Sequence, residues 1–458
     1  YVGSFYAFAI WIGLSLVPIY NAVRKYLNNK VAAIISTLVL LAACPALMAS
    51  ENWDDHDRSG RYTARDIGAN YLNSTAPNSI IFTYGDNDSF PVWYAQEVEG
   101  VRTDVRVINL SYFQAGWYIK MMRQKAYESD PIPMTLPNEK YNDGTRDQLL
   151  INSTGRAVPI KDAVLFAGQD DRRYMYELSR GEFFNYLPSN VFTIDVDSQK
   201  VLSNGTVKDY YKDRLISPMI WNYSSDYVLK GNFAIMDLLA TNDWDRPIYF
   251  ATTVPSSQYN GLENFFVQEG LAYRVAPIKI DEPAPGSFGM IDPYVMYDNV
   301  MNKFKWGNAE DPSVYLDETN RRMFSNFRNT IGDLGKALLA LGDTTKAIEV
   351  ADKGMALVPH SKMPYDYFMI TIAEVYLRAG ETEKGEALLG DIIEYAKEYL
   401  LYISSLDSKF KYGLDYPMGI NMQTILDIYR LSVSLGMTPL ADISEALIND
   451  YYYKLYSY

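Results

Sequence analysis

The sequence predicts an α/β protein with two N-terminal transmembrane helices, a mostly parallel-sheet extracytoplasmic domain, and an all-α helical-hairpin repeat domain. Three observations lead to this fold class. The chain begins with two apolar stretches, its middle alternates between strand and helix patterns, and its last third has helical periodicity with recurring stop signals. The domains are expected at residues 1–50, 51–311 and 312–458.

The composition excludes several classes of protein. Hydrophobic residues make up 48% and charged residues 21%, which rules out long disorder. A net charge of -14 without any run of Arg and Lys argues against a nucleic-acid partner. The single cysteine excludes an intrachain disulfide and a Cys-rich zinc site, and only two histidines are present.

The first fifty residues are expected to form a membrane hairpin. Val2–Ala22 and Val31–Ser50 carry no charged side chain, and each is about 20 residues long, enough to cross the hydrocarbon core of a bilayer. Arg24, Lys25 and Lys30 lie between them, which predicts a cytoplasmic loop. The hairpin would then lie in the inner membrane of a bacterium, in contact with lipid, with the bulk of the chain in the periplasm.

Two further features of this region bear on processing. Leu41-Ala42-Ala43-Cys44 has the pattern of a bacterial lipobox, but the apolar span upstream of it favours a free thiol in an apolar helix. The chain also opens inside an apolar run, which favours the C-terminal part of a longer membrane protein.

The middle of the chain predicts parallel strands joined by helices. Ser79–Tyr84 and Val105–Leu110 are β-rich apolar runs, and a short helix is expected between them at about Pro91–Val98. This order is typical of a βαβ unit. The other expected elements are helices at about 63–72, 116–127, 232–240 and 262–270, and strands at 191–196, 247–254 and 273–275.

After about Pro312 the sequence is helical throughout. Phe368, Ile372, Val375 and Ala379 recur at the spacing of one helix face. Three helix-stop signals follow one another, which predicts stacked helical hairpins, loosely of tetratricopeptide type, although an ordinary bundle is the alternative. The stops are Leu341-Gly342-Asp343, Ala379-Gly380-Glu381 and Leu435-Gly436-Met437. Such repeats are expected to bind protein partners.

The first candidate site follows the second apolar span directly. His56 could act as an acid or base beside a carboxylate, or could simply join a local hydrogen-bond network. The candidate residues of this cluster are Asp54, Asp55, His56, Asp57, Arg58 and Arg61.

The second candidate site is Asp86-Asn87-Asp88, at the carboxyl end of the first predicted strand, where open α/β sheets bind their ligands. Asp86 and Asp88 could present oxygen ligands to a divalent cation. The alternative is structural, with Asp86 and Asn87 capping a turn and Asp88 capping the next helix. We expect the two clusters to converge on one polar site.

Three stretches carry a resemblance: Asn52–Asn70, Phe82–Leu110 and Asn242–Pro277. They resemble a bacterial family of polytopic membrane proteins of unknown function, which is itself similar to the protein O-mannosyltransferases of the GT-C glycosyltransferase superfamily. The resemblance implies a lipid-phosphate-linked sugar donor and a catalytic acidic residue in the first extracytoplasmic loop of a many-helix membrane domain.

This chain departs from that pattern, because only two apolar spans are present and no residue corresponds to the catalytic carboxylate. The resemblance therefore implies the membrane-anchored periplasmic part of a protein O-glycosyltransferase, which holds or recruits acceptor protein. The alternative is a non-catalytic envelope scaffold that binds partners through its helical repeats. The sequence specifies neither the sugar nor the acceptor.

Overall fold

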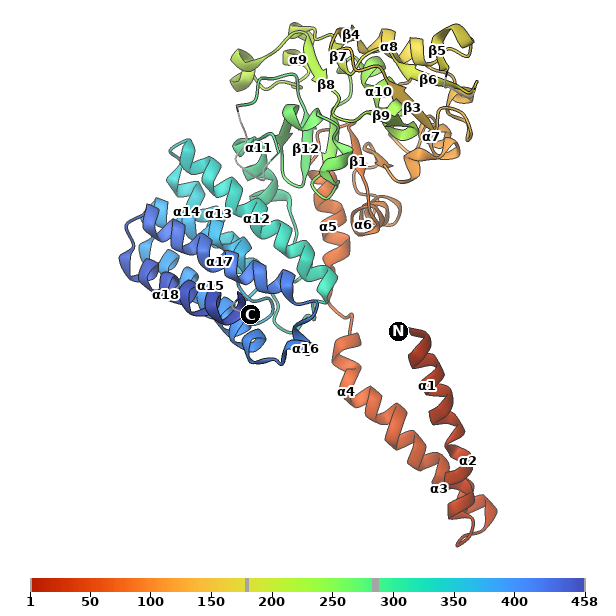
Figure 1. The fold of residues 1–458 in the computed structure, drawn as a ribbon, viewed down its shortest axis with the longest axis vertical. Coiled ribbons are helices and arrows are strands. Elements are labelled where there is room, and N and C mark those ends of the chain that lie inside the picture. The colour runs from red at the N-terminus through yellow and green to blue at the C-terminus, as the bar shows by residue number, and fades with distance from the viewer. Residues whose placement is uncertain (1, 178–180, 282–287, 457–458) are drawn as a thin grey trace. The chain divides into compact units, whose positions relative to one another are not determined.

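The computed structural model describes residues 2–177, 181–281 and 288–456, and the chain divides into two compact units (Figure 1). The first unit consists of Tyr1–Arg61 and the short segment Asp311–Asp317. The second consists of Tyr62–Glu310 and Glu318–Tyr458. The second unit therefore contains both the β-sheets and the helical region.

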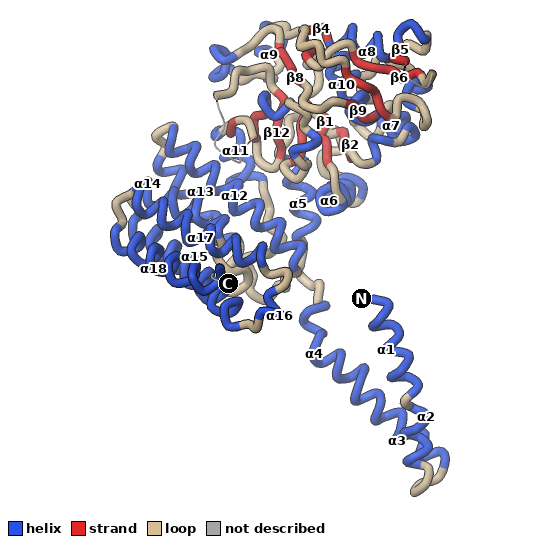
Figure 2. Tube along the Cα trace, viewed as in Figure 1, coloured by secondary structure: helices blue, strands red, loops and turns tan. Residues whose placement is uncertain are grey.

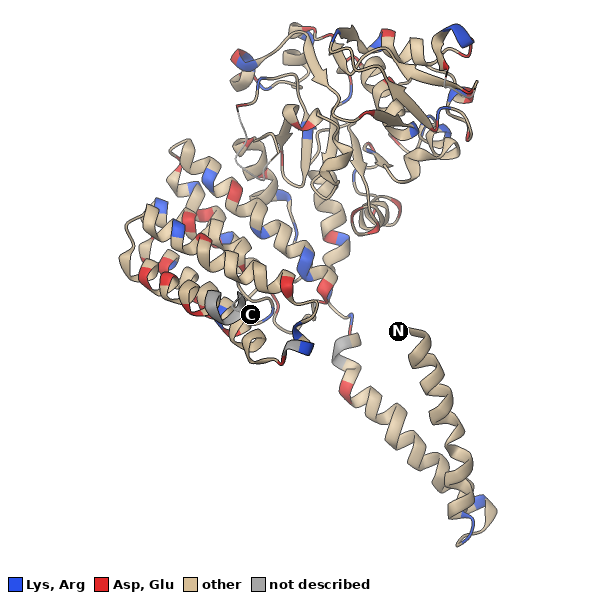
Figure 3. Cartoon of the chain, viewed as in Figure 1, with Lys and Arg blue, Asp and Glu red and all other residues tan. Residues whose placement is uncertain are grey.

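The first unit contains two helices that are long and apolar enough to cross a membrane. They span Val2–Val23 and Asn29–Trp53, with 22 and 25 residues, and few of their side chains are buried. The basic residues of this hairpin gather at the turn between its two helices (Figure 3). The segments are α1 (Val2–Leu14), α2 (Leu16–Val23), α3 (Asn29–Leu41), the π-turn η1 (Ala42–Ala46) and α4 (Leu47–His56). The two predicted apolar spans are confirmed, and their orientation stays a prediction.

The second apolar helix changes its hydrogen-bonding pattern around Pro45. Proline has no backbone N–H to donate, so the ordinary ladder is interrupted and a π-turn forms over Ala42–Ala46. Cys44 lies within this turn as a free, partly exposed thiol.

The main sheet of the second unit has six strands in the order β13-β11-β12-β10-β1-β2. β10, β1 and β2 run parallel, whereas β12 is antiparallel to both β10 and β11, and β11 runs parallel to β13. The prediction of a mostly parallel sheet was wrong, because the sheet is mixed. The strands are β1 (Ile80–Thr83), β2 (Arg106–Asn109), β10 (Ile248–Ala251), β11 (Phe266–Gln268), β12 (Ala272–Val275) and β13 (Met290–Ile291).

The connections after β10 explain the mixed sheet. A helix had been expected at 262–270, but the chain forms only the 3₁₀ turn η7 (Leu262–Phe265) before it enters β11. Gly261 and Gly270, with φ of 95° and 126°, turn the backbone on either side of this segment. The short turn between β11 and β12 can join them only as antiparallel neighbours, since a parallel crossover needs a dozen or more residues.

Helices α5 (Thr63–Asn73) and α6 (Asp86–Glu97) pack tightly against each other beside β1. Gly68 makes this approach possible, because a Cβ at that position would lie 2.1 Å from the carbonyl oxygen of Pro91. The predicted βαβ unit is confirmed: β1, α6 and β2 follow one another, and the two strands are parallel. α7 (Gly116–Met122) is shorter than expected, and α10 (Lys230–Asn242) is slightly longer.

Residues between α7 and β10 form two smaller sheets that the sequence did not predict as such. One has the order β5-β6-β3-β9 and the other β4-β7-β8. Their strands are β3 (Gln148–Ile151), β4 (Ala157–Pro159), β5 (Met175–Glu177), β6 (Phe183–Leu187), β7 (Val191–Ile194), β8 (Met219–Asn222) and β9 (Tyr227–Leu229), with helices α8 (Ile160–Ala167) and α9 (Ser198–Ser203).

The helical region contains three antiparallel hairpins, and no strand is described in it (Figure 2). Gly342, Gly380 and Gly436 lie between the paired helices with φ of 79°, 90° and 71°, so the three predicted stop signals are confirmed. The tetratricopeptide type stays a prediction. The pairs are α12 (Glu318–Ala340) with α13 (Thr344–Leu357), α14 (Ile370–Ala379) with α15 (Thr382–Ser405), and α17 (Asp415–Ser434) with α18 (Thr438–Tyr456). They are preceded by α11 (Pro293–Asp298), and α16 (Ser408–Lys411) joins the last two pairs.

Candidate functional site

Asp86, Asn87 and Asp88 form the first turn of α6, directly after β1. The helix had been expected to begin near Pro91, with Asp88 as its cap. The structure instead places Gly85 at the N-cap position and all three polar residues inside the helix. Carboxylates are favourable in a first helical turn, because they face the unpaired N–H groups of the helix end.

Asp88 is buried and joins the carboxyl ends of two neighbouring strands. Its Oδ2 accepts hydrogen bonds from the backbone N–H of Tyr84 at 3.1 Å and from the Thr253 hydroxyl, which follows β10, at 2.6 Å. Tyr71 of α5 donates to the same Thr253 hydroxyl, and burial raises the pKa of Tyr71 to about 12. Ser89 donates to Oδ1 of Asp88 at 3.2 Å. Asp88 therefore connects α5, β1 and β10.

Among the described residues, the geometry around Asp86 and Asp88 adds no further ligand for a divalent cation. Both carboxylate oxygens of Asp88 already accept hydrogen bonds from the protein, while Asp86 is exposed. No group of three or more His, Cys, Asp or Glu side chains suited to a metal ion occurs among the described residues. Asp88 thus has a structural role in this arrangement, although not as the predicted helix cap, and the metal site stays a prediction.

Replacing Asp88 with alanine is expected to lower the free energy of unfolding by about 1–3 kcal/mol, because two partly buried hydrogen bonds to a charged acceptor would be lost. Asp86→Ala is the matched control from the same turn, and it should change stability by no more than about 0.5 kcal/mol. Thermal unfolding of the purified chain in detergent compares the two variants. Equal losses in both would contradict a structural role that is specific to Asp88.

Asn87 lies beside a pocket of about 210 Å³ beyond the carboxyl ends of β1 and β10. β10 and β2 lie on opposite sides of β1, so this position corresponds to a switch point in the strand order, where α/β sheets commonly bind ligands. Thr253 also lines the pocket, and α12 contributes Thr319, Arg322 and Asn326.

The first candidate cluster belongs to the other unit. His56 Nδ1 lies 2.9 Å from the backbone oxygen of Asn52, and Arg61 pairs with Asp317 at 2.8 Å. Hydrogen bonds from the hydroxyl and backbone N–H of Ser59 hold the pKa of Asp57 below its usual value.

Arg58 donates to the backbone oxygen of Asp57 at 3.5 Å. The side chains of Asp54 and Asp55 lie outside the described part of the chain. Convergence of the two clusters stays a prediction.

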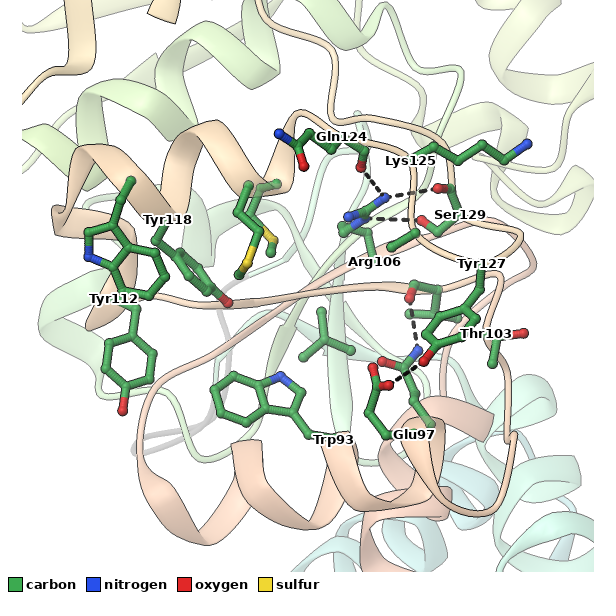
Figure 4. Close-up of a pocket in the computed structure, with 17 residues that line it drawn as sticks. Trp93, Glu97, Thr103, Arg106, Tyr112, Tyr118, Gln124, Lys125, Tyr127 and Ser129 are labelled. Atoms are coloured by element: carbon green, nitrogen blue, oxygen red, sulfur yellow. Dashed lines mark hydrogen bonds between the residues drawn. The ribbon is translucent and has the colours of Figure 1, made fainter.

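The largest cavity among those described had not been predicted. It is a cleft of about 530 Å³, hereafter the aromatic cleft, between α6, the outer edge of β2, the 3₁₀ turn η2 (Tyr112–Gln114), α7 and the loop that follows it (Figure 4). Its lining residues are Trp93, Gln96, Glu97, Thr103, Val105, Arg106, Val107, Tyr112, Trp117, Tyr118, Met121, Met122, Gln124, Lys125, Ala126, Tyr127 and Ser129.

A chain of aromatic rings runs through the aromatic cleft and past its rim. Phe90 and Trp93 on α6 are 5.6 Å apart between ring centroids. Trp93 and Tyr112 stack at 6.1 Å with an interplanar angle of 16°, and Tyr112 lies 6.4 Å from Trp117. Phe90, Tyr112 and Trp117 are all exposed. Exposed Trp, Tyr and Met side chains gathered around a cavity are typical of a binding surface.

Two buried arginines hold the loop that closes the aromatic cleft. Arg106 of β2 donates to the backbone oxygens of Gln124 and Ser129 at 2.9 and 2.8 Å (Figure 4). Arg246, which precedes β10, donates to the hydroxyl of Ser129 at 3.1 Å and to the backbone oxygen of Asp130 at 2.9 Å. Within the described part of the chain, the hydrogen bonds of the Arg246 side chain all go to backbone oxygens and to this hydroxyl. The shape of the cleft therefore depends on both arginines.

The floor of the aromatic cleft is the free edge of the main sheet. β2 is the edge strand, and the backbone N–H groups of Arg106 and Leu110 donate toward β1. The backbone of Asn109 faces the opposite side of β2, where its N–H donates to the Tyr118 hydroxyl at 3.0 Å on the cleft side. This alternation directs the N–H and C=O of Val107 into the cleft as well.

Several polar side chains line the aromatic cleft, although most of its lining surface is apolar. Gln96 donates from its side-chain amide to the backbone oxygens of Arg102 and Val105, both at 2.9 Å, and Glu97 accepts from the Tyr127 hydroxyl. Burial raises the pKa of Tyr118 to about 12, so its hydroxyl stays protonated at neutral pH. A mainly apolar cavity of this size with a few placed polar groups is the usual form of a ligand site.

One signal in the sequence could have indicated this cleft. Phe90 and Trp93 are three residues apart, on one face of the helix after the first strand, and Tyr112 and Trp117 follow the second strand. Because two adjacent parallel strands deliver their following segments to the same edge of a sheet, these aromatic residues were candidates to meet.

The fold and the aromatic cleft together define a membrane protein whose mixed α/β domain carries a ligand-sized site on a sheet edge. The chain belongs to the family described as TMEM260-associated domain 2, whose model matches residues 64–295, about half of the chain. This segment includes the whole aromatic cleft and the main sheet. No curated protein and no solved structure matches the chain. The family match relates the chain to a suggested glycosyltransferase family.

Proposed function

We propose that this chain is the membrane-anchored part of a protein O-glycosyltransferase and that its α/β domain holds the acceptor polypeptide. The family is named after TMEM260, a protein that is itself only suggested to be a protein O-mannosyltransferase. Enzymes of this class must hold a serine or threonine of another protein accessible to a sugar donor. A module that binds an extended segment of that protein meets this requirement.

The observation that carries the proposal is the aromatic cleft on the free edge of β2. An extended peptide can add to a sheet edge through backbone hydrogen bonds, which here would use Val107, while pockets beside the edge accept its side chains. The rings of Trp93, Tyr112 and Trp117 offer large apolar contact area of the kind that dominates binding energy at interfaces.

The role proposed for this chain is binding and presentation of the acceptor. The resemblance to protein O-mannosyltransferases implies that the transfer step uses an acidic residue in a membrane loop and a sugar on a lipid phosphate. The positively charged turn of the N-terminal hairpin, with Arg24, Lys25 and Lys30, supports an orientation with residues 51–458 outside the cytoplasm. In a bacterium that compartment is the periplasm.

Site-specific photocrosslinking in cells tests this proposal. A photoreactive amino acid at Tyr112 is expected to capture polypeptides that carry an O-linked hexose. Tyr294 serves as the control position, because it is similarly exposed, at 53% against 41%, but lies on α11. The combined substitutions Trp93→Ala and Trp117→Ala should reduce capture at position 112 by about tenfold or more. Mass spectrometry of the crosslinked products identifies both the polypeptide and its sugar.

Capture at position 112 no greater than at position 294 would overturn the proposal, and so would capture confined to polypeptides that carry no O-linked sugar anywhere in the same cells. The second candidate function is a scaffold that binds partners through its helical hairpins, which the three successive glycine turns favour. Tyr367, in the helical region, has the same exposure as Tyr112, 41%. Partners captured at position 367 and not at position 112 would favour the scaffold.

A further inference from the structure

A second group of large apolar side chains, four of them aromatic, is exposed at one end of the helical region. It consists of Leu401 and Tyr402 at the end of α15, Phe410 and Tyr412 in and after α16, and Tyr416 at the start of α17. We call these five residues the aromatic end surface. Tyr412 is 96% exposed and Tyr416 is 78% exposed, which is unusual for side chains of this size.

These side chains contribute little to the packing of the helical region. The inward face of the same segment supplies Leu400 and Ile403, which are buried in a core cluster with Ile425 of α17 and Tyr451 of α18. Because this core cluster forms without the aromatic end surface, the packing of the helical region does not explain why these rings are present. A contiguous group of exposed apolar side chains commonly marks a site of interaction with a protein or a membrane.

The charged residues around the aromatic end surface suit a lipid headgroup layer. Lys409 and Lys411 flank Phe410, and the Lys409 ammonium lies 4.7 Å from the centroid of the Phe410 ring. Asp407 and Asp415 balance the two lysines, so the surface is locally neutral in a chain with a net charge of -14. Tyrosine rings and lysine side chains with apolar stems are enriched where proteins meet the membrane–water interface.

The position of this surface in the fold points to the same partner. α12 and α14 lie alongside each other in the same direction, since Gly332 and Gly335 pack against Thr371 and Val375 in that order. α15 runs antiparallel to α14, so the C-terminal end of α15 and α16 lie at the end of the helical region where α12 begins (Figure 1).

The beginning of α12 is connected directly to the unit that contains the membrane helices. Glu318 is the first residue of α12, and the preceding residues, Asp311–Asp317, belong to that unit. This covalent link keeps a bilayer at high effective concentration for the aromatic end surface, so even modest affinity for lipid suffices for docking.

We propose that the aromatic end surface docks on the headgroup layer of the membrane in which the N-terminal helices are embedded. Phe410, Tyr412 and Tyr416 would insert their rings among the headgroups, while Lys409 and Lys411 extend toward the phosphates. Because α12–α18 and the sheets belong to one compact unit, this contact orients the aromatic cleft relative to the bilayer.

Fluorescence of the full chain in lipid nanodiscs tests this proposal. With Cys44 replaced by alanine, Tyr402→Cys carries an environment-sensitive label at the aromatic end surface. Val433→Cys carries it at the far end of α17, and the two positions have nearly equal exposure, 58% and 56%. Lipids with a quencher in the headgroup region should quench the label at position 402 at least about threefold more strongly than the label at position 433.

The substitutions Phe410→Ser, Tyr412→Ser and Tyr416→Ser, added to the variant labelled at position 402, should abolish the difference. These side chains are exposed, so the variant is expected to fold. Equal quenching at positions 402 and 433 in the unsubstituted chain would overturn the proposal. Protection of position 402 in cells but not in purified nanodiscs would also overturn it, and would assign the surface to a protein partner.

Discussion

Replacing Arg246 with methionine is expected to lower the free energy of unfolding by about 3 kcal/mol and to release the loop that closes the aromatic cleft. Arg246 is buried, and burial together with the neighbouring Arg106 lowers its pKa to about 10. Its guanidinium donates to the backbone oxygens of Asn78 and Ser79 at 2.9 and 3.2 Å and to the loop at Ser129. Methionine fills similar volume but leaves these acceptors without their donor, at roughly 1–3 kcal/mol for each one that stays unsatisfied.

Hydrogen exchange of the purified chain in detergent measures this effect locally. Backbone amides of residues 123–131 should exchange faster in Arg246→Met, whereas those of α15 should be unchanged. Arg246→Lys is the matched variant, because it keeps the positive charge but cannot donate in a planar fork to acceptors on both sides. It should behave almost like Arg246→Met, and exchange at the wild-type rate in Arg246→Lys would show that charge alone holds the loop.

Replacing Arg274 with methionine is expected to cost about 3–5 kcal/mol, because it strands a buried carboxylate. Arg274 of β12 pairs with Glu269 at 3.3 Å, and the two side chains are only 3% and 4% exposed. The other carboxylate oxygen of Glu269 accepts a hydrogen bond from Tyr249 of β10 at 2.6 Å. Without the arginine, Glu269 must either stay charged in the interior or take up a proton, and both outcomes destabilise the fold.

A double-mutant cycle separates the lost ion pair from the lost packing. Glu269→Gln removes the charge and retains an acceptor for Tyr249, so the double variant with Arg274→Met should be more stable than Arg274→Met alone by about 1 kcal/mol or more. Thermal unfolding of all three variants in detergent supplies the comparison. A double variant that is less stable than Arg274→Met would show that the charge of Glu269 does not cause the loss.

The location of the second candidate site followed from the sequence, but the roles of its residues did not. An apolar β-rich run followed by Gly85 predicted a strand end, and Asp86-Asn87-Asp88 lies there. Thr253, whose hydroxyl donates a hydrogen bond to Asp88, follows a strand far along the chain. No local pattern reveals such a pair, because it depends on which strand lies next to β1.

The aromatic cleft shows the same division more clearly. Its aromatic residues are visible in the sequence, yet the cavity exists only because β2 is the last strand of the sheet and Arg106 and Arg246 hold a distant loop against it. Whether a strand is central or at an edge is decided by every other strand of the sheet. The residues in and around β2 therefore do not by themselves indicate that β2 is an edge strand.

The sequence by itself determined the features that depend on neighbouring residues. These are the two apolar spans, the β1–α6–β2 unit and the helix ends at Gly342, Gly380 and Gly436, where length, apolar periodicity and the freedom of glycine to adopt positive φ act within a few residues. Only the tertiary structure decided the mixed strand directions, the buried Arg274–Glu269 pair and the aromatic cleft. Each of these joins segments that are far apart in the chain, and their pairing is selected by burial and hydrogen bonding of the whole domain rather than by any local preference.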